Sequence, residues 1–164
     1  HPRLIMYTPM PKRPVILTDR QWLYSTLPID DPRMGRGEPT MPYYPGLDTE
    51  GQHTEWFYHL FPTTCFQLWP DQLSVFQLHP VAPDRTIEHI HMYFVGDAAT
   101  DPEFIEGRQS GYDMWHQLNT EDFTVVESMQ VARNSPAFTG GVLSPYWDVA
   151  TQHLARLLVD AIHR

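Results

Sequence analysis

The 164-residue chain is poor in cysteine and in positive charge, and it has no long hydrophobic run. Its single cysteine, Cys65, excludes an internal disulfide and a multi-thiolate metal site, and it is typical of a reducing compartment. Eleven Lys and Arg residues against 20 Asp and Glu give a formal charge of -9 without a basic cluster, which argues against a nucleic-acid partner. No stretch approaches the roughly 18 apolar residues of a membrane helix, and no signal peptide is recognisable. We therefore expect a cytoplasmic protein that binds neither nucleic acid nor membranes.

Motifs of the common nucleotide-binding and hydrolytic enzymes are also missing. The sequence has no glycine fingerprint for dinucleotides, no P-loop and no nucleophile elbow around a serine. With 41% hydrophobic residues, the chain can nevertheless bury the core of one ordinary domain. These absences leave a metal site or an apolar binding cavity as the functions to consider.

The pattern along the chain predicts a single α+β domain in three parts. Residues 1–52 are rich in proline and turns, and only the run VILTDRQWLY looks capable of regular structure. Residues 53–96 contain four strand-like runs with short connections, which favour an antiparallel sheet. Residues 110–164 contain two helices, and a sheet followed by long helices favours packing of the helices over one sheet face.

Signals for helix ends and strand faces refine this prediction. The first helix is expected over 110–133, and the second opens at Ser144 and Pro145, a favourable N-cap followed by proline at the first helical position. In the last strand, alternation places Ile90, Met92 and Phe94 on one face and His89 and His91 on the other. The histidine pair suits a metal site and equally the outer face of an amphipathic strand, so its role stays open.

Asp122 occupies an unusual position on the first predicted helix. At about 100° per residue, it falls in the middle of an apolar stripe. The stripe is formed by Trp115, Leu118, Val125, Val126 and Met129. An unpaired buried carboxylate would cost several kcal/mol, so Asp122 needs a cation, an arginine, a histidine or a water-filled cavity. The helix pattern alone does not decide between a structural ion pair and a metal or acid–base site.

Several phrases resemble the catalytic domain of Rieske-type non-haem iron ring-hydroxylating oxygenase α subunits. The run LFPTTCFQLWPDQLSVFQLHPVAPDRT is similar to the part of that domain in which a phrase like F-P-N precedes strands that end in a P-x-A/S-P-x-x-T turn. Further on, the motifs W-x-x-x-N-x-E-D, E-x-x-Q and G-x-L-S-P are similar to the end of the same domain. They are carried by Trp115, Asn119, Glu121, Asp122, Glu127, Gln130, Gly141, Leu143, Ser144 and Pro145. The resemblance spans roughly residues 53–160.

This resemblance implies a helix-grip fold, an antiparallel sheet that grips a long C-terminal helix, and a mononuclear Fe(2+) site. The family holds its iron with two histidines and one carboxylate, which leaves positions open for dioxygen. Asp122 matches the motif of the carboxylate ligand, and His1, followed by Pro2 and Leu4, fits the phrase around the second histidine. The first histidine would lie five residues before His1, and the Rieske [2Fe-2S] domain is missing from this chain. The resemblance therefore implies the C-terminal portion of a catalytic domain, truncated at its N-terminus.

The implied activity is insertion of oxygen from O2 into an aromatic or other organic substrate, by ring hydroxylation or oxidative demethylation, as in the breakdown of aromatic compounds. Electrons would come from a reductase or ferredoxin, and the family resemblance implies a homo-oligomer, a trimer. With only two of three iron ligands, the isolated polypeptide is expected to be inactive. A substrate pocket is expected between the sheet and the first helix, although any single one of its side chains is more commonly a core residue. Its lining would be Phe66, Leu68, Phe76, Leu78, Met92, Phe94, Trp115 and Leu118.

Three other interpretations stay open. A non-catalytic helix-grip module would use the same cavity for a hydrophobic ligand, without a metal. An N-terminal copper site at His1, as in copper-dependent polysaccharide oxygenases, would explain the first residue, but it calls for a secreted, usually disulfide-bearing β-sandwich. The third is a degenerate or truncated gene product without function.

Overall fold

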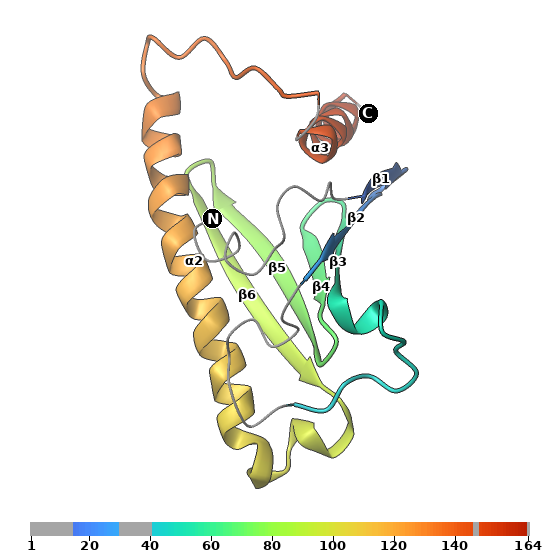
Figure 1. Ribbon diagram of the computed structural model, residues 1–164. Coiled ribbons are helices and arrows are strands. Elements are labelled where there is room, and N and C mark those ends of the chain that lie inside the picture. Colours follow the sequence, from blue (N-terminus) through green and yellow to red (C-terminus); the bar gives the residue numbers. More distant parts are fainter. Residues whose placement is uncertain (1–14, 30–40, 146–147, 164) are drawn as a thin grey trace.

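The computed structural model describes residues 15–29, 41–145 and 148–163, which form one antiparallel sheet and two long helices (Figure 1). The six strands lie in sequence order: β1 (Val15–Asp19), β2 (Trp22–Pro28), β3 (Thr54–Leu60), β4 (Thr64–Leu68), β5 (Gln72–Ala82) and β6 (Arg85–Phe94). The helices are α2 (Ile105–Arg133) and α3 (Val149–Ile162), and three short 3-10 turns are η1 (Gly51–His53), η2 (Gly96–Ala99) and η3 (Pro102–Phe104). This is the predicted α+β, helix-grip-like architecture.

Two of the six strands come from the part of the chain that was expected to be loop-rich. The run VILTDRQWLY forms β1 and the beginning of β2, joined by a turn at Arg20 and Gln21. β2 then pairs along its whole length with β3. The sheet therefore extends beyond the four predicted strands, because β3 offers an edge that the β1–β2 hairpin covers.

The sheet has an inner face, which the helices cover, and an outer face. Cys65, Phe76 and Ile90 are paired across β4, β5 and β6, so they share the inner face. Ile90 packs directly against the core, whereas His89 and His91 are exposed on the outer face. The predicted alternation along this strand is confirmed.

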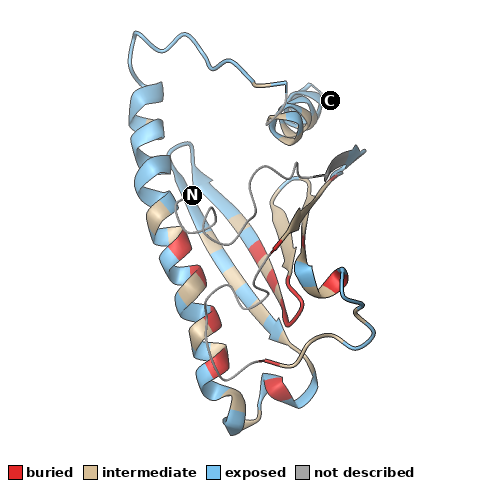
Figure 2. Cartoon of the chain, in the orientation of Figure 1, coloured by how far each residue is buried: buried red, intermediate tan, exposed pale blue. Residues whose placement is uncertain are grey.

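The core lies between the inner face and the first half of α2. Its buried members are Ile29, Trp69, Phe76, Trp115 and Leu118. The Trp115 ring stands edge-on to both Phe76, at 5.4 Å between centroids, and Trp69, at 6.3 Å. Edge-to-face packing of this kind adds to the stabilisation from apolar burial. Figure 2 shows the buried positions of α2 confined to its first half.

Both helices begin at positions other than those predicted. α2 starts at Ile105, one turn before Ser110, directly after η3. α3 starts at Val149 rather than at Ser144, because the Ser144 backbone N–H donates to Asp148 Oδ2 at 2.7 Å in a turn ahead of the helix. Neither these helices nor any other described helix combines the length and apolar character that a membrane span requires.

Candidate functional site

Asp122 lies on α2 where the helix leaves the sheet. Trp115 and Leu118 are buried, but further along the same stripe Val126 is 60% exposed, and Asp122 itself is exposed. The prediction of a buried Asp122 is therefore wrong. A helix of 29 residues is about 43 Å long, and its apolar stripe continues past the part of the sheet that covers it (Figure 2).

A hollow of about 600 Å³ nevertheless adjoins Asp122, between α2 and the hairpin of β5 and β6. This hollow, the α2–hairpin hollow, is lined from the strands by Leu78, Pro83, Asp84, Arg85, Thr86 and Glu88, and from the helix by Asn119, Asp122, Phe123, Val126, Glu127 and Gln130. Its size is ordinary for a site that takes a small organic molecule. Asp122 thus faces the same side of α2 as Trp115 and Leu118, as predicted, but across a hollow rather than within packed core.

Glu88 stands on the strand side of this hollow. Its Oε1 accepts a hydrogen bond from Asn119 Nδ2 at 2.6 Å, which ties β6 to α2. Burial raises the pKa of the Glu88 carboxyl, the Asn119 hydrogen bond lowers it, and the nearby Asp122 carboxylate raises it. The net shift of the Glu88 pKa is upward, and burial is its largest cause.

The sequence analysis missed Glu88, although a signal was present. Alternation places Glu88 on the same face of β6 as Ile90 and Met92, where a charged side chain is unexpected. This is the argument that singled out Asp122 on its helix. Applied to the strand, it would have brought both carboxylates to attention.

Cys65 also lies near Glu88, on the inner face of β4. Burial, and then the Glu88 charge, raise the pKa of the Cys65 thiol to about 11. At neutral pH the group is therefore a protonated thiol, which is a weak nucleophile and a weak metal ligand.

Six of the eight predicted pocket residues lie on the inner side of the sheet, in two sets. Phe76, Trp115 and Leu118 are core residues, and Met92 packs against them. Leu78 lines the α2–hairpin hollow, and Phe94 lies on the same inner face of β6.

Phe66 and Leu68 lie on the outer face, so their assignment to the same cavity is wrong. The register explains the error, because Phe66 is paired with Val75, and Phe76 with Cys65. On the outer face, they line a shallow hollow together with Trp22, Tyr24, Tyr58 and Leu73.

The histidines contribute little to the described part of the hollow. His1 lies outside the described residues. His89 stacks near His91 and stands edge-on to His79 at 5.1 Å between ring centroids, all on the outer face. Within the ranges that the structure describes, no three His, Cys, Asp or Glu side chains are grouped closely enough to hold a metal ion.

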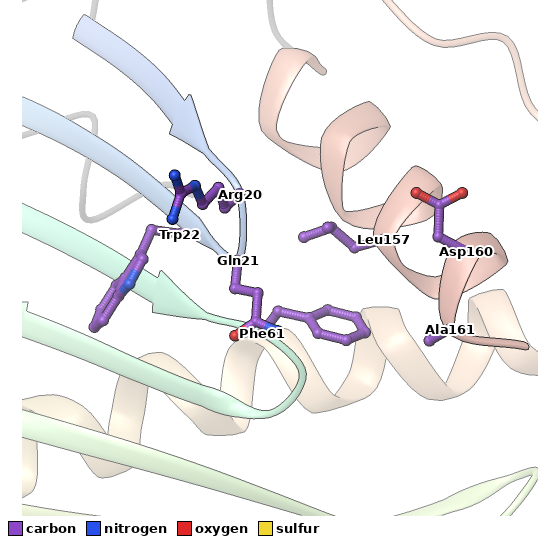
Figure 3. Close-up of a pocket in the computed structure, with 7 residues that line it drawn as sticks. All are labelled: Arg20, Gln21, Trp22, Phe61, Leu157, Asp160 and Ala161. Carbon is purple, nitrogen blue, oxygen red and sulfur yellow. The ribbon is translucent and has the colours of Figure 1, made fainter. Parts of the chain in front are cut away.

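Two further hollows lie near α3. One, of about 650 Å³, separates the β1–β2 turn from the helix, and Figure 3 shows Leu157 pointing from α3 toward this turn while the Phe61 ring points toward the end of α3 at Ala161. The other, of about 260 Å³, lies on the inner face between Phe57, Gln67 and Ala150. Neither is lined by a residue of α2, so both are separate from Asp122.

Comparison with known families identifies the domain. The model of the ring-hydroxylating α-subunit catalytic domain matches residues 13–164. The chain belongs to this family. The match includes both long helices and every residue that lines the α2–hairpin hollow, and it makes the chain an oxygenase domain, an oxidoreductase at the level of the family. Among curated proteins, none matches the chain significantly.

Proposed function

We propose that Asp122 is the carboxylate ligand of a mononuclear non-haem iron in the α2–hairpin hollow. The observation that carries this proposal is that Asp122, at the motif position of the family's carboxylate, faces a hollow that it shares with Glu88. The Asp122 carboxylate disfavours the charged form of Glu88, and a cation bound beside them would offset that effect. An oxygen donor of this type also suits the site of two histidines and one carboxylate that non-haem iron prefers.

The histidine side of the site is assigned by family resemblance. No histidine lines the described part of the hollow, and His1, the residue that matches the second histidine, lies outside the described ranges. The Rieske [2Fe-2S] centre would be held elsewhere, since it takes two cysteines and this chain has one. We infer a reductase or ferredoxin as the electron source.

The proposed reaction is oxygen insertion from O2 into an aromatic or other organic substrate. Ferrous iron, when bound, would supply the activation of dioxygen. The chain's own residues position the partners: the Asp122 carboxylate donates one oxygen ligand, and Leu78, Phe123 and Val126 offer apolar contacts for the body of the substrate. Asn119 fixes Glu88 beside them through its hydrogen bond.

Replacement of the proposed ligand tests this function. Because Asp122 is exposed, we expect Asp122→Ala to change the free energy of unfolding by less than about 1 kcal/mol while it abolishes the binding of iron supplied together with free imidazole, which stands in for the missing histidine ligands. Iron content by atomic emission and thermal unfolding would be measured together. Asp113→Ala is the matched control, because Asp113 is exposed on the same helix and accepts a hydrogen bond from Gln109 of that helix at 2.8 Å.

The result also separates the alternatives. Full iron content in Asp122→Ala under these conditions would contradict the proposed function. Unchanged binding of a hydrophobic ligand, with no iron in the wild-type protein even when imidazole is present, would favour a non-catalytic binding module. Stoichiometric copper in place of iron would favour an N-terminal copper site.

A further inference from the structure

Glu88 is held in an unusual place for a carboxylate. Its strand neighbours Ile87 and His89 are exposed on the outer face, but Glu88 points to the inner face, where it is partly buried beneath α2. It is paired with Leu78 across the hairpin, and both line the α2–hairpin hollow. A charged group that is partly withdrawn from water here requires compensation by polar partners.

The described structure supplies only part of that compensation. Oε1 of Glu88 accepts the 2.6 Å hydrogen bond from Asn119, and this is the one hydrogen bond that Glu88 makes within the described ranges. The bond fixes the orientation of the carboxylate, since an amide donor to a charged acceptor is a strong contact. Oε2 is therefore a pre-oriented acceptor at the wall of the hollow.

The charges around the hollow select against anions. Among the residues that the structure describes, the lining contains the carboxylates of Asp84, Glu88, Asp122 and Glu127 and the guanidinium of Arg85. A doubly charged iron would leave this described part of the lining negative. A substrate carboxylate placed here would meet like charge and would leave Oε2 without a donor, and both effects weaken its binding.

We propose that Glu88 determines substrate specificity by accepting a hydrogen bond from an O–H or N–H group of the substrate. This inference rests on the proposed function. The substrate class is a neutral or cationic organic molecule, such as an aromatic alcohol or amine, and aromatic carboxylates are excluded. Leu78, Phe123 and Val126 contact the apolar part of the substrate, while Glu88 accepts a hydrogen bond from its polar group.

Three probes with the same ring distinguish this specificity: benzyl alcohol, benzylamine and benzoate. Their dissociation constants would be measured by calorimetry under nitrogen, with ferrous iron in excess over the protein because the site is weak, so that turnover is not required. We expect the alcohol and the amine to bind at least about tenfold more tightly than benzoate. This ratio corresponds to a difference of about 1.4 kcal/mol in binding free energy. Equal binding of benzoate would overturn the proposal.

The variant Glu88→Gln separates the charge from the hydrogen bond to Asn119, because its amide oxygen can still accept from Asn119 Nδ2. We expect it to bind benzoate more tightly and benzylamine more weakly, which reduces the ratio of the two affinities at least about tenfold. Glu106→Gln, an exposed change in the first turn of α2, should leave the ratio as in the wild type. An unchanged ratio in Glu88→Gln would contradict the proposal.

A second variant covers the case in which Glu88→Gln does not fold. Glu127 is exposed at the rim of the same hollow, so Glu127→Gln should fold and shift the ratio in the same direction by a smaller factor. No shift would overturn the electrostatic selection. The proposed function is judged separately, by iron content in Asp122→Ala, so failure of one proposal is distinguishable from failure of the other.

Discussion

At the scale of single residues, Glu55 is a buried acid that does not line the candidate site. It lies on the inner face of β3, it is 0% exposed, and neither of its carboxylate oxygens has a hydrogen-bond partner among the described residues. Burial raises the pKa of the Glu55 carboxyl well above its usual range. Its neutral, protonated form is therefore the one that the fold favours.

This shift makes stability depend on pH in a defined direction. Above the ordinary pKa of glutamic acid, the unfolded chain has released this proton and the folded chain retains it, so the free energy of unfolding falls as pH rises toward the folded-state pKa. Glu55→Gln removes the titrating group. We expect the variant and the wild type to be similar near pH 4, and the variant to become the more stable protein as pH increases to 8, by about 1.4 kcal/mol for each unit of pKa shift.

Urea unfolding followed by fluorescence at intervals between pH 4 and pH 8 would measure this difference. Glu50→Gln is the matched control, because it makes the same chemical change at an exposed position. Parallel pH profiles for the wild type and Glu55→Gln would show that burial of Glu55 is not coupled to its protonation.

At the scale of elements, the two faces of the sheet differ in what they contribute to stability. Phe76 is 8% exposed on the inner face and contacts Trp115, whereas Phe66 is partly exposed on the outer face, 6.4 Å from the Trp22 ring. Removal of a buried phenylalanine side chain costs about 3–5 kcal/mol. We expect Phe76→Ala to lose this amount and Phe66→Ala to lose less than half of it, as measured by urea unfolding. Equal losses would place both rings in one core.

The same pair shows where the sequence was sufficient and where it was not. Alternation predicted the faces within β6 correctly, because the side-chain period of a strand is fixed at two. Faces on different strands depend on the register between them, and a shift of one residue moves a side chain to the other face. The register pairs Cys65, not Phe66, with Phe76, and no local pattern specifies that choice.

For α2, the pattern predicted direction but not burial. The stripe that contains Asp122 does face the sheet side, as the buried positions of Trp115 and Leu118 show. The stripe does not reveal how far the sheet reaches along a 29-residue helix, and beyond Leu118 it faces the α2–hairpin hollow and then solvent. The carboxylate was therefore found for a sound reason, while its surroundings depended on tertiary structure.

At the scale of the whole molecule, the candidate site lies where α2 diverges from the hairpin of β5 and β6. β5 and β6 form its strand wall and α2 forms its helix wall, whereas α3 packs against β1 and β2 at the opposite edge of the sheet, where His153 Nε2 lies 2.9 Å from the Arg20 carbonyl oxygen. The molecule therefore has a packed core beside α2 and separate hollows toward the two edges of the sheet. Groups near Asp122 can therefore vary without loss of the core, which suits a site for substrate and metal.

The last prediction concerns the 164-residue polypeptide alone. In the described ranges, the α2–hairpin hollow offers carboxylates and two amides but no histidine, and His1 would add one imidazole. Two ligands make a weak site for ferrous iron. We therefore expect the folded polypeptide to retain well below one equivalent of iron after gel filtration under nitrogen, and to show no turnover with a reductase.

Free imidazole tests the reason for this expected weakness. If missing histidine ligands limit the site, added imidazole should increase iron retention in the wild-type polypeptide and not in Asp122→Ala, because the carboxylate still has to anchor the metal. Circular dichroism would establish that both polypeptides are folded. One full equivalent of iron without imidazole, together with turnover, would show that the chain completes the site by itself. An equal gain in both polypeptides would show that imidazole binds the iron away from Asp122, and only the family match would then connect this aspartate with the metal.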